Sequence, residues 1–452
     1  MRHQTARSDY GTLLWKEYQW GVDYRLYDII DHAYKDRDAS FEYDDRGYLV
    51  RAIYDHKEEQ FRTADKLGNL YETKNKTDRK YTNSQLQQDR TYYYHYDVEG
   101  NLIFKEYIKD IGYRPVFSGG ELRDRGINPK STGKGILYTW NANGSLRSVT
   151  DLEGTTYRFR YDAFGRRLEK RRMASTFRFV WDGNVLLHET FKKDNSENTE
   201  LTTWVFEGFV PTAKLVNGKA YSIISDHLGT PILAIDSEGN EVWNRQLDIY
   251  GRVKREIKAS SLGDDVHPFI PFLYQGQYYD FETKLAYNRF RYYSPETGAY
   301  ISQDPIGLAG GNPTLYGYVG DSNWWVDRFG LDCNKKDFTK INGGTIEDDF
   351  INKHSTKHKY DESKISTRNK TQYGKDIDVK KLREDTMNNP DEVKIQKDAS
   401  GNVYGTTYKK DYDFNISTND TPSNKHRVII NHLNNERSTQ FPFYEKPKKD
   451  NK

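Results

Sequence analysis

The stretch TTYRFRYDAFGRRLEK, residues 155–170, contains the pattern that decides the fold. Aromatic residues at every second position, Tyr157, Phe159 and Tyr161, alternate with arginines, and this period is typical of a strand with one buried face. An Asp follows the last aromatic residue, and a Gly stands three positions after that Asp. The Asp carboxylate accepts hydrogen bonds from the backbone just ahead, and Gly provides the positive φ of a tight hairpin. The stretch therefore predicts strand, turn and strand.

The same unit recurs along much of the chain: an aromatic or apolar residue, Asp or Asn, two variable residues, then Gly. Copies begin at residues 43, 64, 96, 140, 150, 161, 225, 235 and 247, with a degenerate copy at 181. Most of the intervals between copies lie near multiples of about 11 residues, which is the rhythm of strand, turn and strand. The 36 Tyr residues and an aromatic fraction of 14% also favour strands.

These copies resemble the YD repeats of Rhs proteins and of the related teneurin and insecticidal-toxin proteins, over about residues 40–331. A second stretch, YNRFRYYSPETGAYISQDPIGLAGGNPTLYGYVGDSNWWVDRFGL (287–331), resembles the Rhs repeat-associated core. The resemblance implies a mainly β fold, in which a spiralling sheet closes into a hollow shell around a C-terminal cargo. It also implies that the core seals this shell.

The residues after the core differ in composition from those before it. Residues 333–452 contain 24 Lys and Arg against 19 Asp and Glu, whereas the rest of the chain contains 45 against 48. All eight Trp lie at or before Trp325, and only six of the 36 Tyr follow residue 332. This shift predicts a boundary near Leu331. We expect three parts: a YD-repeat shell at 1–270, the core at 271–331 and a toxin domain at 332–452.

Several classes of protein do not fit the sequence. A single cysteine, Cys333, excludes a disulfide framework and a thiolate metal site. No apolar run approaches 18 residues, so no membrane span is predicted. The N-terminal residues lack the apolar centre of a signal peptide and begin in strand-like sequence. We therefore expect a piece of a longer protein, secreted or delivered by another route.

The core resemblance also implies self-cleavage. In relatives, a closing Asp-Pro-x-Gly-Leu segment is cut after its Leu by aspartate-dependent self-proteolysis; here the segment reads DRFGL, with Arg328 where Pro is usual. A carboxylate pair suits this task because two adjacent acids cannot both ionise, so one holds a proton while the other activates water. The residues implied are Asp304 and Asp327 as the acids, Arg291 as charge support, and the bond between Leu331 and Asp332 as the cut. The alternative is that both acids only cap turns.

The tail reads as a small α+β domain. Apolar spacing predicts helices over 346–360 and 376–389. A hairpin signal, ASGN, stands inside 392–410, and further strands are predicted over 411–418, 426–433 and 438–443. Helices first, then three to five antiparallel strands, is the expected order.

The chemistry of the tail points to metal-independent RNA cleavage. It contains no P-loop, dinucleotide motif, HExxH or CxxC. It does contain histidines, cations and hydroxyls, and one His can take the proton of a ribose 2′-hydroxyl while another protonates the leaving oxygen. Lys or Arg would stabilise the charge on the phosphorane, and the net positive charge would gather a polyanion. The candidates are His358, His426, Arg427, Thr439, His354 and Lys359.

This set, with the final Ser-Thr-x-Phe-Pro segment at 438–442, is similar to toxin RNases of the barnase–EndoU–colicin–RelE superfamily. The resemblance implies an RNA substrate (tRNA, rRNA or mRNA), no cofactor, and action in the cytoplasm of a target cell. It also implies an acidic immunity protein and secretion-system components as partners. Competition between bacteria is the expected context.

Other interpretations stay open. An ADP-ribosyltransferase would carry a Ser-Thr strand, which FNIST (414–418) could supply, but a matching catalytic Glu is missing near the end. A DNase is a further alternative, and so is a non-enzymatic cell-surface binding protein. His354 and His358, one helical turn apart, could form a solvated face; as a metal site they lack a clear carboxylate partner.

Overall fold

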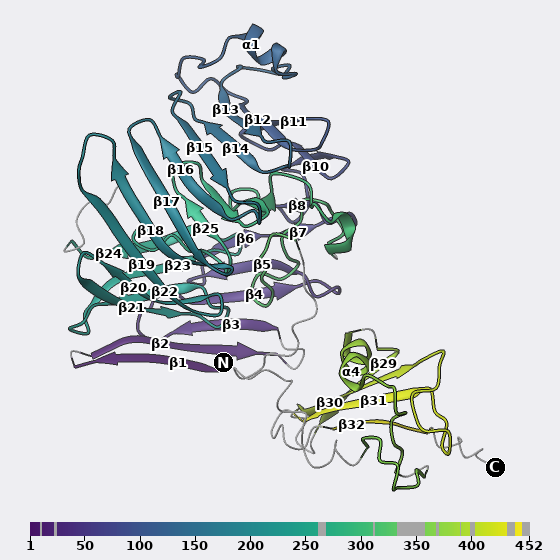
Figure 1. The fold of residues 1–452 in the computed structure, drawn as a ribbon. Coiled ribbons are helices and arrows are strands. Elements are labelled where there is room, and N and C mark those ends of the chain that lie inside the picture. The colour runs from purple at the N-terminus through teal and green to yellow at the C-terminus, as the bar shows by residue number, and fades with distance from the viewer. Residues whose placement is uncertain are drawn as a thin grey trace. The chain divides into compact units, whose positions relative to one another are not determined.

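The structure is a computed structural model that describes residues 1–9, 11–21, 25–260, 268–310, 312–331, 358–367, 370–388, 390–397, 403–431 and 439–444. Its internal contacts divide the chain into two units, Met1–Asn334 and Lys335–Lys452. Strands dominate the described part of both units (Figure 1). The predicted fold class, a mainly β chain with a small α+β domain at its end, is confirmed.

The first unit consists of antiparallel sheets whose strands follow chain order. A six-stranded sheet comprises β1 (His3–Ser8), β2 (Gly11–Trp20), β3 (Leu26–Asp31), β4 (Ala39–Tyr43), β5 (Leu49–Tyr54) and β6 (Glu58–Phe61). The short strands β7 (Thr63–Ala64) and β8 (Leu70–Tyr71) pair with each other. A four-stranded sheet closes the unit with β25 (Tyr278–Asp280), β26 (Leu285–Asn288), β27 (Arg291–Ser294) and β28 (Ala299–Tyr300), followed by a 3-10 helix, Gly307–Gly310.

Between them runs a sixteen-stranded sheet, in which each strand pairs with the next along the chain (Figure 1). Its strands are β9 (Lys80–Thr82), β10 (Gln85–Gln88), β11 (Tyr92–Tyr96), β12 (Leu102–Tyr107), β13 (Gly135–Trp140), β14 (Leu146–Thr150), β15 (Thr156–Tyr161), β16 (Arg167–Arg172), β17 (Ser175–Asp182), β18 (Val185–Lys193), β19 (Thr199–Glu207), β20 (Val210–Val216), β21 (Lys219–Ser225), β22 (Pro231–Ile235), β23 (Glu241–Leu247) and β24 (Val253–Lys258).

The repeat unit forms the turns as predicted. In the hairpin between β15 and β16, Asp162 Oδ1 accepts from the N–H groups of Phe164 and Arg166, both at 2.9 Å. Gly165 has a φ of +77°, a value that L side chains rarely adopt. Tyr157 and Phe159 are buried, whereas Arg158 and Arg160 are exposed. The alternation predicted for this stretch is confirmed.

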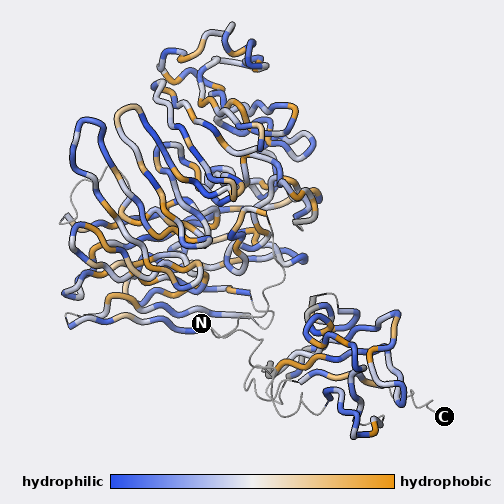
Figure 2. The backbone as a smooth tube through the Cα atoms, viewed as in Figure 1, coloured by the Kyte–Doolittle hydropathy of each residue, from blue (hydrophilic) through white to orange (hydrophobic). Residues whose placement is uncertain are grey.

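The aromatic face of the long sheet packs against the four-stranded sheet. Phe159 lies 5.6 Å from Tyr292, and Phe179 lies 5.4 Å from Tyr278, measured between ring centroids. Figure 2 shows hydrophobic and hydrophilic residues interspersed along the strands. Burial of each aromatic side chain stabilises the fold by roughly 1.5–3 kcal/mol relative to an exposed one. This aromatic layer therefore holds the four-stranded sheet against the sixteen-stranded sheet.

A carboxylate anchors the longest connection described in the sheet, which joins β12 to β13 and carries helix α1 (Gly119–Asp124). Glu106 is fully buried, and burial alone would raise its pKa. A hydrogen bond from His95 and others from the backbone lower the pKa to about 2. The backbone donors are the N–H groups of Lys130, Ser131 and Gly133, at 2.8, 2.8 and 2.9 Å. One buried side chain of the sixteen-stranded sheet, Glu106, therefore holds this connection in place.

The second unit contains helix α4 (Val379–Asn388) and a four-stranded antiparallel sheet. Its strands, in sheet order, are β29 (Glu392–Lys397), β30 (Val403–Asp411), β31 (Lys425–Asn431) and β32 (Thr439–Pro442). Helix α4 packs against β30 and β31. The helix predicted over 376–389 is present as α4, and the hairpin predicted within 392–410 is present as β29 and β30. The strands predicted over 426–433 and 438–443 are present as β31 and β32.

One predicted strand is wrong. Residues 411–418 do not continue as a strand after Asp411, the last residue of β30. Asn415 Oδ1 instead accepts from the N–H groups of Ser417 and Ser423, at 3.2 and 2.9 Å, so the backbone turns. Short polar side chains compete with strand pairing in this way. The predicted helix over 346–360 lies mostly outside the described residues. Among the described residues, no helix is long and apolar enough to cross a membrane.

Candidate functional site

The core brings together the three side chains predicted for self-cleavage. Arg291, in β27, is 1% exposed, and its Nη2 lies 2.9 Å from Asp304 Oδ2 and 3.4 Å from Asp327 Oδ2. Both carboxylates are buried as well. One guanidinium thus spans two acids that are 23 residues apart in the chain. A charged pair held this way keeps its geometry because each partner is expensive to bury alone.

Asp327 holds the chain that leads to the predicted cut. Its Oδ1 accepts from the N–H groups of Gly330 and Leu331, at 2.8 and 3.1 Å, and more weakly from Phe329. The Nε of Arg291 donates to the Gly330 carbonyl. We call Arg291, Asp304 and Asp327 the triad. Arg291 and Asp327 therefore both bind the backbone at the predicted cut. Asp332 lies outside the described residues.

The glycine before the cut is constrained. Gly330 has a φ of +71°, and a Cβ placed there would lie 2.4 Å from the Asn288 carbonyl oxygen. Arg328, the residue after Asp327, donates from Nε to Gln275 Oε1 at 2.9 Å. Asp327 keeps its contacts to the segment with Arg at this position. The turn at Asp327 therefore forms with Arg at position 328.

Two residues that sequence reasoning missed complete this site. Tyr300 donates its hydroxyl to Asp327 Oδ2 at 2.8 Å, and its ring lies 3.7 Å from the Arg291 guanidinium carbon. Asn288 Nδ2 donates to the Tyr300 hydroxyl and to the Asp327 carbonyl, at 2.7 and 2.8 Å. Burial and the neighbouring Asp327 carboxylate raise the pKa of Tyr300 well above its ordinary value, so this hydroxyl keeps its proton.

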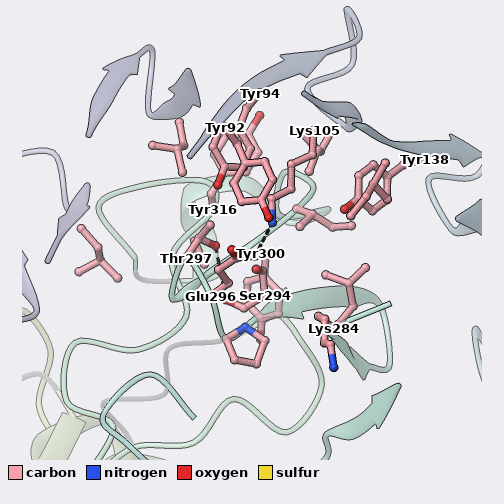
Figure 3. A pocket seen from close by; sticks show the side chains of 18 of the residues that line it. Tyr92, Tyr94, Lys105, Tyr138, Lys284, Ser294, Glu296, Thr297, Tyr300 and Tyr316 are labelled. Atoms are coloured by element: carbon pink, nitrogen blue, oxygen red, sulfur yellow. Dashed lines mark hydrogen bonds and ion pairs between the residues drawn. The ribbon is translucent and has the colours of Figure 1, made fainter. Parts of the chain in front are cut away.

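Tyr300 also lines a cavity of about 580 Å³ between the long sheet and the four-stranded sheet. Figure 3 shows its walls: Tyr92, Tyr94 and Tyr138 lie on one side, and Ser294, Glu296 and Thr297 on the other. Lys105 and Glu296 form an ion pair across it. The cavity is rich in hydroxyl groups, and Tyr300 connects it to Asp327.

In the second unit, the register of the sheet sorts the candidate residues onto two faces. Residues paired across strands share a face. Arg427 pairs with Lys409 on one side and Phe441 on the other, and Ile429 pairs with Thr439. Arg427, Phe441 and Thr439 therefore share one face, which we call the basic face. The same face also carries Glu392, Lys394, Thr407, Lys409, Asp411, Lys425 and Ile429.

His358 joins the basic face through Phe441. The two rings are stacked, with centroids 5.0 Å apart, and the Arg427 guanidinium carbon lies 5.8 Å from the same Phe441 ring. His358 Nδ1 lies 2.6 Å from the Thr371 carbonyl oxygen. A carbonyl only accepts, so the proton sits on Nδ1 and Nε2 is left as the basic nitrogen of the neutral ring. Lys359, the next residue, is exposed.

His426 lies on the opposite face, under helix α4. It is fully buried, with Nε2 2.8 Å from the Tyr373 hydroxyl and Nδ1 2.6 Å from Thr386 Oγ1. Burial, with a smaller contribution from Arg383, lowers the pKa of His426 to about 3. Its ring is therefore neutral at physiological pH. The structure brings His358, Arg427 and Thr439 to one face and places His426 on the other.

Some candidates lie outside the described residues, namely His354 and Asp332. Among the described residues, no three His, Cys, Asp or Glu side chains gather as metal ligands do. FNIST at 414–418, the segment that suggested a transferase strand, forms the turn around Asn415.

Comparisons with known proteins extend these observations. The family model of the teneurin YD-shell matches residues 73–308. Probable deoxyribonuclease RhsA of Dickeya dadantii is 33% identical over 254 residues, which cover 54% of this chain and 16% of that protein. Double-stranded DNA deaminase toxin A of Burkholderia cenocepacia is 28% identical over 355 residues, covering 70% and 22%. tRNA nuclease WapA of Bacillus subtilis is 31% identical over 188 residues, covering 40% and 8%. The chain spans less than a quarter of the length of each relative.

Proposed function

The chain belongs to the teneurin YD-shell family, and on this premise we propose that it is the shell-and-cargo end of a polymorphic toxin. Residues 1–270 form part of the shell wall, residues 271–331 seal it, and residues 332–452 are the toxic cargo. The three relatives are named for three different activities on nucleic acids, which supports a nucleic-acid-directed cargo. The activity of this cargo has to be proposed from its own residues.

We propose that the core cuts the chain after Leu331. The observation that carries this proposal is the single guanidinium of Arg291 held between Asp304 and Asp327. Two carboxylates around one guanidinium supply the pair of acid–base groups that a hydrolysis requires. Asp327 accepts hydrogen bonds from the N–H groups of residues 329–331, and Arg291 donates to the Gly330 carbonyl, so the backbone is held against that pair.

The cleavage step balances as a hydrolysis. The ionised carboxylate takes a proton from water while the water oxygen attacks the Leu331 carbonyl carbon. The protonated carboxyl gives its proton to the Asp332 nitrogen as the carbon–nitrogen bond breaks. Leu331 ends with a new carboxyl group and Asp332 with a new amino group, and the two acids have exchanged roles.

Substitution of each acid tests the cleavage. The full chain should separate into two fragments on a denaturing gel, and Asp304→Asn or Asp327→Asn should leave one chain. Asp97→Asn is the matched control, because Asp97 caps a hairpin turn of the wall with bonds to Glu99 and Asn101 and touches none of the triad. Cleavage of both acid variants at the normal rate would refute the proposal.

For the cargo we propose metal-independent ribonuclease activity on the basic face. His358 Nε2 takes the proton of a ribose 2′-hydroxyl, and Arg427 stabilises the charge that grows on the phosphorane. Thr439 and Lys359 contact the phosphate or the ribose. Because His426 is buried and neutral, we assign it the positioning of helix α4 rather than proton transfer. Water protonates the leaving oxygen as the phosphorus–oxygen bond breaks, and His358 releases the proton that it accepted to solvent.

Sequencing of RNA ends tests the ribonuclease proposal. The full chain, and residues 332–452 alone, would be induced in a bacterium or incubated with total RNA and EDTA. New RNA ends are expected, and His358→Ala and Arg427→Gln should reduce them at least 100-fold, in the range of losses when an acid–base group is removed. Lys381→Gln is the control, because it removes a cation from the exposed side of α4. Intact RNA beside cut DNA would favour the deoxyribonuclease alternative.

The proposed function implies partners. An immunity protein should cover the basic face, and acidic side chains would complement its cations. Secretion-system components would carry the shell to the target cell, where the cargo acts in the cytoplasm on RNA.

A further inference from the structure

The outer face of the long sheet carries a cluster of cations. On β15, β17 and β18 aromatic residues take inward positions, and on β16 the buried Arg167 and Lys170 do so. The outward positions of these four strands include five basic side chains, which we call the arginine face: Arg158, Arg160, Arg171, Arg178 and Lys192. Arg171 and Arg178 have side chains that are 51% and 70% exposed. Figure 1 shows these strands side by side in the wall.

One pair of these cations opposes stability, whereas Arg160 and Arg178 are both cross-strand partners of Glu169. Arg158 and Arg171 are direct cross-strand partners in the register, and like charges placed opposite each other in a sheet repel. Two acids partly offset the cluster: Glu169 lies 3.6 Å from Arg178, and Asp194 lies 3.2 Å from Arg171. Among the described residues, Arg158 and Arg160 form no ion pair. The cluster therefore keeps a net positive charge that the fold itself does not use.

Apolar side chains adjoin the arginine face on the same side of the sheet. Leu168 and Val180 lie among the cations and are 41% and 51% exposed. On the next two strands, Leu201, Val205 and Leu215 are 50%, 44% and 42% exposed. Their register with Thr190 and Thr203 puts Leu201 and Leu215 on the outward side. An open surface that combines cations with exposed Leu and Val has the composition of an interfacial membrane-binding face.

We propose that the arginine face, with its apolar neighbours, docks the shell onto an anionic lipid bilayer. The guanidinium groups would bind lipid phosphates, and the Leu and Val side chains would enter the headgroup boundary. A single-stranded nucleic acid fits less well, because the aromatic residues of β15 to β18 point to the other side and offer no stacking platform.

Vesicle sedimentation of the full chain tests this proposal. The chain should bind vesicles of phosphatidylglycerol and phosphatidylcholine, bind pure phosphatidylcholine weakly, and detach as salt rises. The triple variant Arg158→Gln, Arg171→Gln, Arg178→Gln should lower the partition coefficient about 100-fold, from roughly fivefold for each cation. Its melting temperature should not fall, because the substitution also removes like-charge repulsion.

Two further variants keep the test specific. Lys66→Gln, Lys74→Gln, Lys80→Gln removes the same charge from exposed positions elsewhere in the wall and should change binding little. Leu201→Asn with Leu215→Asn should weaken binding while the salt dependence stays the same. The proposal is overturned if the two triple variants lose binding equally, if the arginine variant keeps full binding, or if duplex DNA binds more tightly than vesicles at equal phosphate concentration.

Discussion

Acid should loosen the cargo domain through His426. The ring is fully buried, and both of its nitrogens bond to buried hydroxyl groups, those of Tyr373 and Thr386. Burial lowers the folded-state pKa to about 3, whereas an unfolded histidine titrates near 6.5. A base with a lowered folded pKa stabilises the fold fully above pH 6.5. That stabilisation is lost as the pH falls from 6.5 toward 3.

The size of this effect follows from the two pKa values. At pH 4.5, which is about two pH units below 6.5, the unfolded state gains about 3 kcal/mol relative to the folded state. Replacing His426 with Ala at pH 7.5 removes both hydrogen bonds and leaves a cavity, which costs on the order of 3–5 kcal/mol. The variant has no ring to protonate, so it should lose this acid sensitivity.

Hydrogen exchange measured by mass spectrometry resolves the effect within the full chain. Peptides of α4 and β31 should exchange about 100-fold faster at pH 4.5 than at pH 7.5, after correction for intrinsic rates. Peptides of the long sheet, such as those of β17 and β18, serve as the internal reference. The reasoning is refuted if α4 keeps its protection in acid, or if His426→Ala shows the same pH dependence as the unaltered chain.

Three further substitutions have defined outcomes. Tyr300→Phe removes a hydrogen bond to the Asp327 carboxylate worth about 1.5–3 kcal/mol, so self-cleavage on a timed gel should slow about 10- to 100-fold, and an unchanged rate would exclude a positioning role. Gly330→Ala places a Cβ 2.4 Å from the Asn288 carbonyl at a positive φ, so uncleaved chain should accumulate, and normal cleavage would contradict the tight turn. Glu106→Gln replaces one acceptor oxygen with an NH2 group, which leaves some of the three N–H donors without a partner at about 1–3 kcal/mol, so trypsin should cut residues 108–134 at least tenfold faster, and equal digestion would show that another contact holds this connection.

The strands and turns of the long sheet could be predicted because they depend on patterns of neighbouring residues. The alternation around Phe159 and the Asp162–Gly165 turn depend only on neighbouring residues, and the structure repeats them along the long sheet. Resemblance to relatives supplied the acids of the core. Tyr300 and Asn288 were missed because they meet Asp327 only through the pairing of β26, β27 and β28, which no local pattern encodes.

In the second unit, tertiary contacts determined more of what the sequence could not predict. The sequence predicted a strand over 426–433, but it could not show which face of that strand helix α4 covers. Burial of His426 is a tertiary property of Tyr373, Thr386 and the strand together. The false strand over 411–418 failed for a different reason, since one side chain, Asn415, outcompeted strand pairing.

The most direct test of a shell that releases its own cargo is the intact mass of the purified chain. We predict two polypeptides, one ending at Leu331 and one whose first residue is Asp332, that together account for the 53.1 kDa chain plus one water molecule. Asp304→Asn should yield a single uncut species. A single intact chain from the unaltered sequence, or a cut at any other bond, would contradict the account.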